Sequence, residues 1–346
     1  MKRRGVRLER HRGFRPGGQN MNESTGGRSR SVLITGGSGY IGSLLVSDLA
    51  SDRGGLETIV CMDLRAVPEE LRANGVHYCT GDVRDPGIAD LFRSHGVDTV
   101  IHLAAIVTPG KDSSRELEYS IDVLGTQNVL DKCLETGVRK LIVTSSGAAY
   151  GYYADNPQPL TEEHPIRGNP EFAYSDHKRL VEEMLARYRS DHPELAQLIF
   201  RPGTILGERV SNQITAIFER PVILGVRGSD TPFVFIWDRD VVACLRKGAL
   251  EDRTGVYNLA GDGVLLLAEI AQRVRKRYVA PPAGAIRGAL RLLRPLGLSP
   301  YGPEQVDFLR YRPVLSNERL KSEFGYTPRL TTSEVFDLYW RSREDG

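Results

Sequence analysis

The sequence has no long apolar run and few cysteines. Across its 346 residues, no apolar run approaches the roughly eighteen consecutive residues that a membrane-spanning helix needs. No apolar segment follows the basic N-terminus as it does in a secretory signal. The four cysteines are widely spaced without a Cys-x-x-Cys pair, so we expect neither a metal site nor a disulfide framework. We therefore expect a cytoplasmic protein without a membrane span.

Acidic residues are scarce at the start of the chain. Residues 1–30 hold nine Lys or Arg and two Glu, a net charge of +7, whereas the whole chain carries +2, so residues 31–346 carry −5. The first segment is rich in Gly and Arg and lacks apolar periodicity, which predicts a disordered basic extension. A solvated tail is the commoner role of such a segment, and we predict no specific nucleic-acid partner.

From Ser31 onward, short apolar runs such as "SVLIT", "TIVCMD" and "RKLIVTSS" alternate with segments of helical periodicity. Strands that are apolar at nearly every position indicate a parallel sheet covered on both faces. The pattern predicts an α/β protein with a doubly wound parallel sheet, the Rossmann fold. We expect a cofactor domain over residues 31–205 and a smaller substrate-binding lobe over 206–346, with some return of the chain to the first domain.

Two helical segments bear on contacts with partners. "SRELEYSIDVLGTQNVLDKCLETG" predicts one long helix over residues 114–137. The stretch "AIRGALRLLRPLGL" has Leu and Arg at helical spacing. We expect this helix to bury its leucine side against the lobe, with contact to a membrane surface as the alternative.

A glycine cluster follows the first strand directly. "VLITGGSGYIG" places Gly36, Gly39 and Gly42 at three-residue intervals where a helix begins. Gly36 permits the tight turn, Gly39 lets the backbone approach a pyrophosphate, and Gly42 allows the helix to pack closely. The start of that helix, with Tyr40 and Ile41, offers unpaired N–H groups to the phosphates. The cluster predicts a dinucleotide-binding turn.

The next strand supports a nicotinamide dinucleotide. "TIVCMD" ends in Asp63, about 20 residues beyond the glycines, where a carboxylate can accept both hydroxyls of the adenosine ribose. A 2′-phosphate would be repelled by this charge, so NAD is favoured over NADP. Arg65 lies two positions further on, which keeps NADP open.

Five short motifs follow one another along the chain in a fixed order. "TGGSGYIG", "YCTGDVRD", "VIHLAA", "TSSGAAYG" and "YSDHK" together resemble the extended short-chain dehydrogenase/reductase family, the NAD-dependent epimerase/dehydratase group, over about residues 31–265. The resemblance implies that Asp82 contacts the adenine and that Val83 packs beside it. It implies further cofactor contacts from the ends of two later strands: Leu103, Ala104, Ala105 and Pro202.

The same resemblance makes Tyr174 the proton donor or acceptor and Lys178 its partner, both also placed against the cofactor. A phenol with a pKa of about 10 is a poor base at neutral pH and needs a cationic neighbour, and residues four apart share one helix face. Ser146, the last residue of "TSS", would hold the substrate oxygen, with Thr144 on the same side as a lesser contributor. His177 is expected at the surface or in the lining of the cleft.

Two departures from the family pattern limit the chemistry. Asp122 in "IDVLGT" stands where many members carry an asparagine that shapes the helix and a water path, so the proton relay differs here. The dehydratase branch usually carries Thr-Asp-Glu after the fifth strand, but this chain has Ser-Gly-Ala at 146–148. Without these carboxylates, sugar 4,6-dehydration is disfavoured.

The predicted substrate side is less informative. Nucleotide-sugar epimerases of this family commonly have an arginine where this chain has the apolar surroundings of Phe233, although Arg227 and Arg239 are close in sequence. Phe233 and the other rings of "FVFIW" suit a less polar ketone or alcohol, or simply a buried strand. Tyr150 of "AAYG" is expected to line the substrate cleft.

Three functions follow from these motifs. The leading hypothesis is an NAD-dependent oxidoreductase that interconverts a secondary alcohol and a ketone in a small-molecule substrate. The alternative is a nucleotide-sugar 4-epimerase, similar to UDP-glucose 4-epimerase, with the same Tyr174, Lys178 and NAD. A non-catalytic NAD-binding regulator is disfavoured, because such proteins typically lose the tyrosine or the lysine. The resemblance also implies a homodimer formed by the helix over 114–137 and the helix that carries Tyr174.

Overall fold

The computed structural model describes residues 31–110, 113–298 and 302–344. The predicted basic extension, residues 1–30, lies outside the described residues. In these ranges no helix is both long enough and apolar enough to cross a bilayer.

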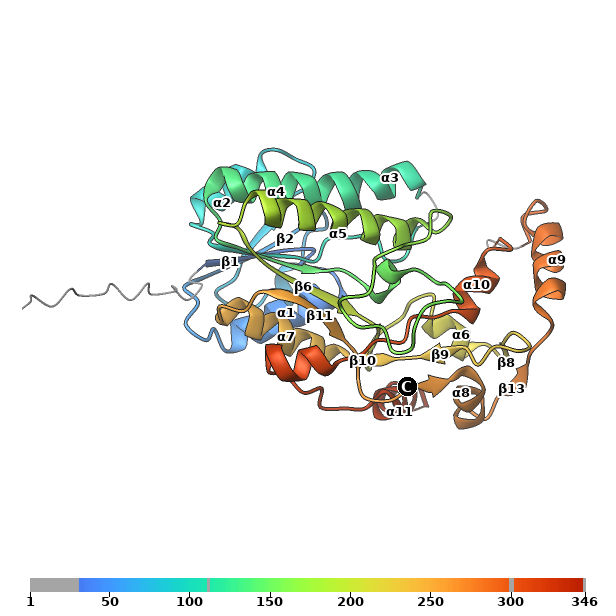
Figure 1. Ribbon diagram of the computed structural model, residues 1–346. Coiled ribbons are helices and arrows are strands. Elements are labelled where there is room, and N and C mark those ends of the chain that lie inside the picture. Colours follow the sequence, from blue (N-terminus) through green and yellow to red (C-terminus); the bar gives the residue numbers. More distant parts are fainter. Residues whose placement is uncertain (1–30, 111–112, 299–301, 345–346) are drawn as a thin grey trace, which may run out of the picture.

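A parallel sheet of seven strands forms the centre of the molecule (Figure 1). Its strands are β1 (Ser31–Thr35), β2 (Thr58–Asp63), β3 (His77–Thr80), β4 (Thr99–His102), β5 (Lys140–Thr144), β6 (Ala196–Pro202) and β11 (Gly255–Leu259). They lie in the order β11-β6-β5-β4-β1-β2-β3, and every neighbouring pair is parallel. The order reverses between β1 and β4, which is where a doubly wound sheet opens a crevice at the carboxyl ends of its strands. The predicted Rossmann fold is confirmed.

Helices cover both faces of this sheet (Figure 1). The helices around the sheet are α1 (Tyr40–Ser51), α2 (Ile88–Ser94), α3 (Arg115–Tyr119), α4 (Gly125–Thr136), α5 (Ala173–Asp191) and α7 (Asp238–Leu250), with the short 3-10 turns η1 (Glu69–Leu71) and η3 (Gly147–Tyr150). Ile34 packs under α1 and α7, whereas its neighbour Leu33 packs under α2, α4 and α5. Side chains that alternate along each strand therefore pack into two separate apolar layers, one on each face of the sheet.

The C-terminal lobe is built from short elements and three small two-stranded sheets. Its strands are β7 (Thr204–Leu206), β8 (Val222–Leu224), β9 (Pro232–Phe233), β10 (Phe235–Trp237), β12 (Leu265–Leu266) and β13 (Arg277–Val279). Its helices are α6 (Thr215–Glu219), α8 (Leu267–Arg273), α9 (Ala283–Leu293), α10 (Gln305–Arg310) and α11 (Thr332–Glu344). The π-helical turn η4 (Leu320–Phe324) returns to the seven-stranded sheet, where Leu320 and Phe324 join the apolar layer under α1 and α7. A separate apolar cluster that includes Phe218, Phe235 and Phe336 holds the lobe together.

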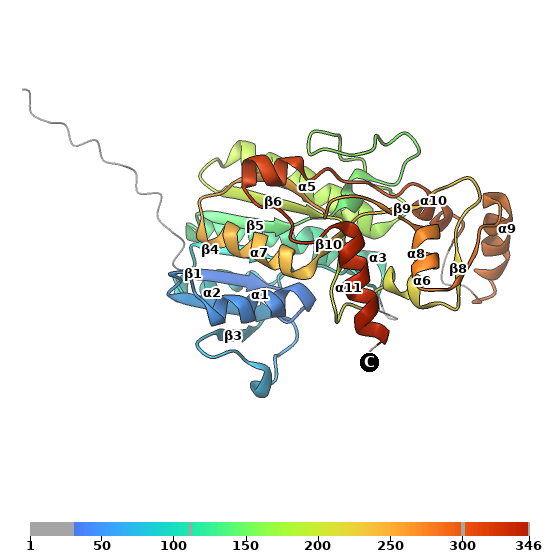
Figure 2. The ribbon, with the colours of Figure 1, turned by 90° about the horizontal axis from the view of Figure 1, so that it is seen from below.

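Helix α9 differs from the expectation for "AIRGALRLLRPLGL". We expected its leucine side to be buried against the lobe, but no residue of α9 is buried. Figures 1 and 2 show the helix at the extreme end of the lobe, near β8. The prediction of a buried leucine side is therefore wrong.

The predicted long helix over residues 114–137 is interrupted. Between α3 and α4 the chain forms a π-helical turn, η2 (Ser120–Leu124). A π turn holds one more residue than an α-helical turn and occurs frequently at functional sites. Here the turn carries Asp122, whose Oδ1 accepts a hydrogen bond of 2.8 Å from the N–H of Ile106. The bond ties the helix to the loop that follows β4.

Candidate active site

The glycine turn after β1 has no room for side chains. Gly36 has a φ of 70°, and a Cβ atom there would come within 2.7 Å of the nitrogen of Ala104. A Cβ atom on Gly42 would lie 2.2 Å from the carbonyl oxygen of Gly36. Gly39 begins α1 without a side-chain cap, so the first N–H groups of the helix can bind an anion. A cradle of bare backbone at a helix N-terminus fits the pyrophosphate of a dinucleotide.

The side chains of Tyr40 and Ile41 point away from this cradle. The Tyr40 hydroxyl donates a 2.5 Å hydrogen bond to Asp238 Oδ2 at the start of α7, and Ile41 packs against the core under α1. Burial raises the pKa of the Asp238 carboxyl. The side chains of both residues are therefore engaged within the protein.

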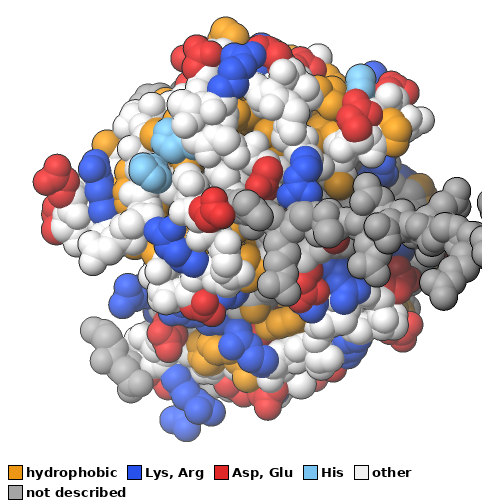
Figure 3. Space-filling view, turned by 90° about the vertical axis from the view of Figure 1, so that its left-hand side faces the viewer, with side chains coloured by type: hydrophobic (Ala, Val, Ile, Leu, Met, Phe, Trp, Pro, Cys, Tyr) orange, Lys and Arg blue, Asp and Glu red, His pale blue; other side chains and the backbone are white. Residues whose placement is uncertain are grey.

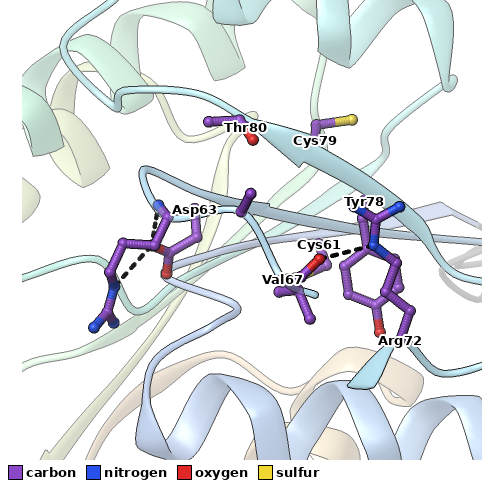
Figure 4. A pocket seen from close by; sticks show the side chains of 9 residues that line it. Cys61, Asp63, Val67, Arg72, Tyr78, Cys79 and Thr80 are labelled. Atoms are coloured by element: carbon purple, nitrogen blue, oxygen red, sulfur yellow. Dashed lines mark hydrogen bonds and ion pairs between the residues drawn. The ribbon is translucent and has the colours of Figure 1, made fainter. Parts of the chain in front are cut away.

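Asp63 lies in a pocket at the carboxyl ends of β2 and β3 (Figure 4). Its Oδ2 accepts a 3.1 Å hydrogen bond from the N–H of Ser38 in the glycine turn, and its Oδ1 accepts one of 3.0 Å from the N–H of Arg65. The Arg65 side chain is 75% exposed, with Nε 3.8 Å from Asp63 Oδ1. The pocket is lined by Cys61, Asp63, Arg65, Ala66, Val67, Arg72, Tyr78, Cys79 and Thr80. A nucleoside would thus meet the carboxylate beside the turn that holds its phosphates.

Asp82 and Val83 follow β3 on the other side of this pocket. Asp82 forms an ion pair with Arg84, with 2.6 Å between Oδ2 and Nη2, and the hydrogen bonds from Arg84 lower the pKa of the Asp82 carboxyl. Val83 is buried against α4, where a Cβ atom on Gly125 would come within 2.7 Å of its Cγ2. The Val83 side chain therefore packs in the apolar layer that α4 shares with α2 and α5.

The predicted segment after β4 borders the glycine turn. The N–H of Leu103 donates to the carbonyl oxygen of Thr35 at 3.1 Å, and that of Ala104 lies 3.4 Å from the Thr35 hydroxyl. Leu103, Ala104 and Ala105 are all partly exposed. Pro202 is buried at the end of β6, next to β5 in the sheet. The ends of β1, β4 and β6 thus lie at the same edge of the parallel sheet.

Ser146, Tyr174 and Lys178 come together where β5 ends and α5 begins. The Ser146 hydroxyl interacts with the Tyr174 phenol and favours its ionised form. Lys178 Nζ donates to the carbonyl oxygen of Thr144 at 3.1 Å and lies 5.8 Å from the centre of the Tyr174 ring. The hydroxyl of the adjacent Ser145 donates to Glu182 instead. The arrangement leaves Ser146 as the strand-end hydroxyl that faces Tyr174.

The surroundings shift the pKa values of both titratable groups. Burial raises the pKa of Tyr174, the Ser146 hydroxyl opposes this shift, and the charge of Asp122 adds to it. Burial lowers the pKa of Lys178, against the charges of Asp122 and Glu182. Without further positive charge nearby, the phenol therefore stays protonated at neutral pH.

Asp122 and His177 form a buried pair beside these groups. His177 Nδ1 lies 3.2 Å from Asp122 Oδ2, with side-chain exposures of 1% and 3%. The ring of Tyr119 meets the imidazole edge-on at 5.7 Å. Among the described residues, His177 Nε2 has no hydrogen-bond partner. The expectation of a surface or cleft-lining His177 is wrong, because the π turn brings a carboxylate inward to meet it.

Tyr150 and Phe233, both predicted on the substrate side, lie in the interior. Tyr150 is fully buried; its hydroxyl accepts a 2.8 Å hydrogen bond from Arg201 and donates one of 2.9 Å to Asn258 Oδ1. Phe233 is 1% exposed and stacks on Phe235 at 5.6 Å. Neither side chain lines an open cleft in this structure. The Tyr150 hydroxyl can be buried because Arg201, Asn258 and the carbonyl oxygen of Thr161 satisfy it.

An aromatic cluster that sequence reasoning missed packs beside Tyr174. The Phe172 ring lies 6.2 Å from Tyr174 and 4.6 Å from Phe308 of α10, and Tyr152 lies 5.2 Å from Phe308. These residues come from three separate segments of the chain, so no local spacing could predict their contact. The cluster joins the start of α5 to the C-terminal lobe.

Arg312 is the second feature that the sequence did not reveal. Its guanidinium lies 4.2 Å above the Phe233 ring and donates a 3.1 Å hydrogen bond to the Thr204 hydroxyl. Burial lowers its pKa, and Tyr152 opposes that shift. In the described part of the chain, no carboxylate forms an ion pair with it. The site near Phe233 that looked apolar therefore holds an unpaired cation, supplied by a distant segment.

Comparisons with known proteins agree with this geometry. The chain is 24% identical over 315 residues to an uncharacterized protein of Mycobacterium tuberculosis, covering 90% of this chain and 84% of that protein. It is 32% identical over 194 residues to the UDP-glucose 4-epimerase of Erwinia amylovora, covering 53% of this chain and 56% of that enzyme. The structure of Thermus thermophilus UDP-glucose 4-epimerase in complex with NAD is similar, with a TM-score of 0.68 and 25% identity over 91% of this chain and 99% of that one.

The family model for the NAD dependent epimerase/dehydratase family matches residues 32–247, well over half of the chain. This match confirms the predicted family, and the hypothesis of an NAD-dependent oxidoreductase or epimerase agrees with it. With its Rossmann sheet, its glycine cradle and its grouping of Ser146, Tyr174 and Lys178, the chain belongs to the NAD-dependent epimerase/dehydratase family of enzymes.

Proposed function

We propose that this protein interconverts a secondary alcohol and a ketone by hydride transfer, with Tyr174 as the acid or base. The observation that carries the proposal is the grouping of Ser146, Tyr174 and Lys178 where β5 ends and α5 begins, with Lys178 Nζ 5.8 Å from the centre of the Tyr174 ring and the Ser146 hydroxyl close enough to influence the Tyr174 phenol. A bound nicotinamide would accept or return the hydride. Side chains of this protein would position the substrate and transfer the proton.

Each residue of the group has a separate task in this proposal. Ser146 holds the substrate oxygen toward Tyr174, and Tyr174 takes the hydroxyl proton as the hydride leaves or gives it back in the reverse direction. Lys178 is fixed by its bond to the carbonyl oxygen of Thr144, and its positive charge favours the phenolate that burial disfavours. Thr144 therefore contributes through its backbone.

NAD is the cofactor that the ribose pocket favours. The Asp63 carboxylate is anchored by the N–H groups of Ser38 and Arg65. From there it can accept the ribose hydroxyls, and it would repel a 2′-phosphate. Arg65 is mostly exposed and points its charge to solvent. We therefore propose NAD in preference to NADP.

The substitution Tyr174→Phe tests the catalytic proposal. Loss of the acid–base group should lower kcat by a factor of roughly 100 to 10,000 while NAD binding is kept. Tyr188→Phe, on the same helix but bonded to Asp131, is the matched control and should keep full activity. Turnover by the Tyr174→Phe protein at near wild-type rate would refute the role of Tyr174.

A nucleotide-sugar 4-epimerase is the second candidate, and Arg312 favours it. An unpaired, half-buried guanidinium is suited to a phosphate group of the substrate. The chain spans about half the length of the curated relatives named UDP-glucose 4-epimerase. The two candidates differ in net redox change: an alcohol oxidoreductase forms NADH in proportion to product, whereas an epimerase turns over UDP-glucose without net NADH and retains its NAD.

We also propose that Asp122 and His177 are positioning residues for the reacting group. Asp122 binds the backbone of Ile106 with one oxygen and His177 with the other. Through these two contacts it links the loop after β4, which borders the cofactor crevice, to the helix that carries Tyr174. The pair thus fixes the spacing between cofactor and acid–base group.

We also propose a homodimer. The helices that the family resemblance assigns to the dimer contact carry exposed apolar side chains. Leu117 and Tyr119 of α3 and Leu124 at the end of η2 are exposed apolar side chains. Exposed apolar residues on adjoining turns are typical of association surfaces. Light scattering of the purified protein should give twice the mass of one chain, and Leu124→Asp should give the mass of one.

A further inference from the structure

The far end of the C-terminal lobe carries a cluster of exposed leucines. Four large apolar side chains within seven positions are exposed: Leu292 (73%), Leu293 (37%), Leu296 (69%) and Leu298 (70%). They belong to the last turn of α9 and the segment directly after it, and no residue of α9 is buried. Exposed apolar clusters of this kind mark contact surfaces.

The orientation of α9 is the reverse of that of an ordinary surface helix. Arg287, Arg291 and Arg294 follow one another at helical spacing and form one stripe. Arg287 binds Asp307 of α10 at 2.7 Å, and Arg294 lies 3.4 Å from Glu304. The arginine stripe is therefore the side anchored to the protein. The leucine side is turned outward because the ion pairs fix the opposite side.

The surroundings of α9 are strongly basic. Residues 270–303 contain seven Lys or Arg and no Asp or Glu, although residues 31–346 as a whole carry −5. Arg275, Arg277 and Arg291 are exposed, and within the described ranges none of them forms an ion pair. At the opposite end of the molecule, basic and acidic side chains are interspersed (Figure 3). Positive charge thus gathers around the exposed leucines.

We propose that α9 and the segment to Leu298 dock on a lipid bilayer that contains anionic head groups, with the helix lying in the interface. An amphipathic helix with leucines on one side and unpaired arginines nearby matches such a surface in both polarity and charge. With 11 residues, α9 is about 16 Å long, too short to span a hydrocarbon core of about 30 Å. The inference does not depend on the proposed function.

A second copy of the chain fits this surface less well. A two-fold contact would bring the same basic region of two molecules together, and like charges would then oppose the burial of the leucines. Exposed Val222 and Leu224 of β8 extend the apolar surface at this end of the lobe (Figures 1 and 2). A bilayer supplies an apolar layer and negative charge at once.

Docking of α9 would bring the candidate active site close to the membrane. Helix α10 is tied to α9 by the ion pair between Asp307 and Arg287. The same short helix places Phe308 against Phe172, next to Tyr174. The proposed membrane contact and the aromatic cluster beside Tyr174 are thus joined through one element.

Flotation of the purified full-length protein with vesicles tests the proposal. Binding to vesicles of phosphatidylcholine with phosphatidylglycerol should exceed binding to phosphatidylcholine alone. The double substitution Leu292→Asp and Leu296→Asp should weaken binding at least about tenfold. Leu71→Asp is the matched control, because Leu71 is 71% exposed on a different surface, and it should bind as the wild type does.

The basic residues 1–30 could bind anionic vesicles on their own, so a local readout is needed. Leu292→Trp places an indole in α9, and its fluorescence should shift to shorter wavelength when anionic vesicles are added. Unchanged flotation of the double Asp variant, or an indole that stays in water while the protein floats, would overturn the proposal. So would loss of a dimer in the double Asp variant without loss of vesicle binding, since the leucines would then face a second copy.

Discussion

The cofactor half and the C-terminal lobe of this molecule place their polar side chains by different rules. In the cofactor half, Asp63 ends one parallel strand and Ser146 follows another, and both lie at one edge because the strands of a doubly wound sheet end together. In the lobe, Arg312 reaches Phe233 from a distant segment after several short elements. Where the topology is regular, local motifs predict which residues of a site meet. Irregular connections give no such local signal.

The first prediction concerns the glycine turn, where local sequence and tertiary contact agree. Gly42→Ala should destabilise the fold by about 1–3 kcal/mol and weaken NAD binding at least about 100-fold, because the added Cβ would lie 2.2 Å from a carbonyl oxygen. Thermal unfolding and NAD titration measure both effects. Gly288→Ala in α9 meets no atom within 4 Å and should be neutral or stabilising. Equal behaviour of the two variants would remove the close-packing explanation.

The second prediction concerns the lobe, where only the folded structure revealed the cation. Arg312→Ala should raise the KM of a phosphate-bearing substrate by roughly 10- to 100-fold and change kcat much less. Steady-state kinetics with UDP-glucose measures this split. Arg227→Ala, at an exposed position of the same lobe, should leave KM unchanged. A KM that does not respond to Arg312→Ala would show that the unpaired guanidinium does not bind substrate phosphate.

The third prediction returns to the cofactor half. Asp63→Asn should raise the Kd of NAD about tenfold, because a charge-assisted hydrogen bond to the ribose becomes a neutral one. The same change removes the repulsion of a 2′-phosphate, so the preference for NAD over NADP should narrow. Calorimetric titration with each nucleotide measures both constants. Asp90→Asn, at an exposed position of α2, is the control. An unaltered preference would speak against Asp63 as the ribose ligand.

The fourth prediction concerns the junction of the two halves. Asp122 raises the pKa of Tyr174 through its negative charge, so Asp122→Asn should lower that pKa. For alcohol oxidation, which needs the phenolate, the acid limb of the pH profile of kcat should then move to lower pH. The other titratable groups facing Asp122 are His177 and Lys178 on α5 and His102 on β4; His102 is buried and neutral, since burial lowers its pKa to about 3.

A purely structural role of Asp122 would lower stability without moving the pH profile. Asp131→Asn is a suitable control, because Asp131 also links α4 to α5 through Tyr188 but lies away from the reacting group. It should leave the profile where it is. An acid limb that stays fixed in Asp122→Asn as well would contradict the electrostatic effect.

Sequence reasoning succeeded where spacing fixes geometry. The strand, turn and helix around Gly36 and the confirmed sheet follow from apolar periodicity and from the need for bare backbone at close contacts. The proximity of Tyr174 and Lys178 follows from four-residue spacing on a helix. His177 and Tyr150 show the limit: each has an ordinary local pattern, and each is buried where polar partners from distant segments, Asp122 or Arg201, meet it.

The sequence by itself determined the fold class, the family and the place of the dinucleotide turn, because these depend on short-range periodicity and on glycine sterics. Only the tertiary structure decided that η2 turns Asp122 inward, that Arg312 lies over Phe233, and that α9 shows its leucines to the outside. Each of these depends on pairing between segments far apart in the chain. An ion pair or a stacked cation has no signature in local sequence, since either partner alone looks like an ordinary surface residue.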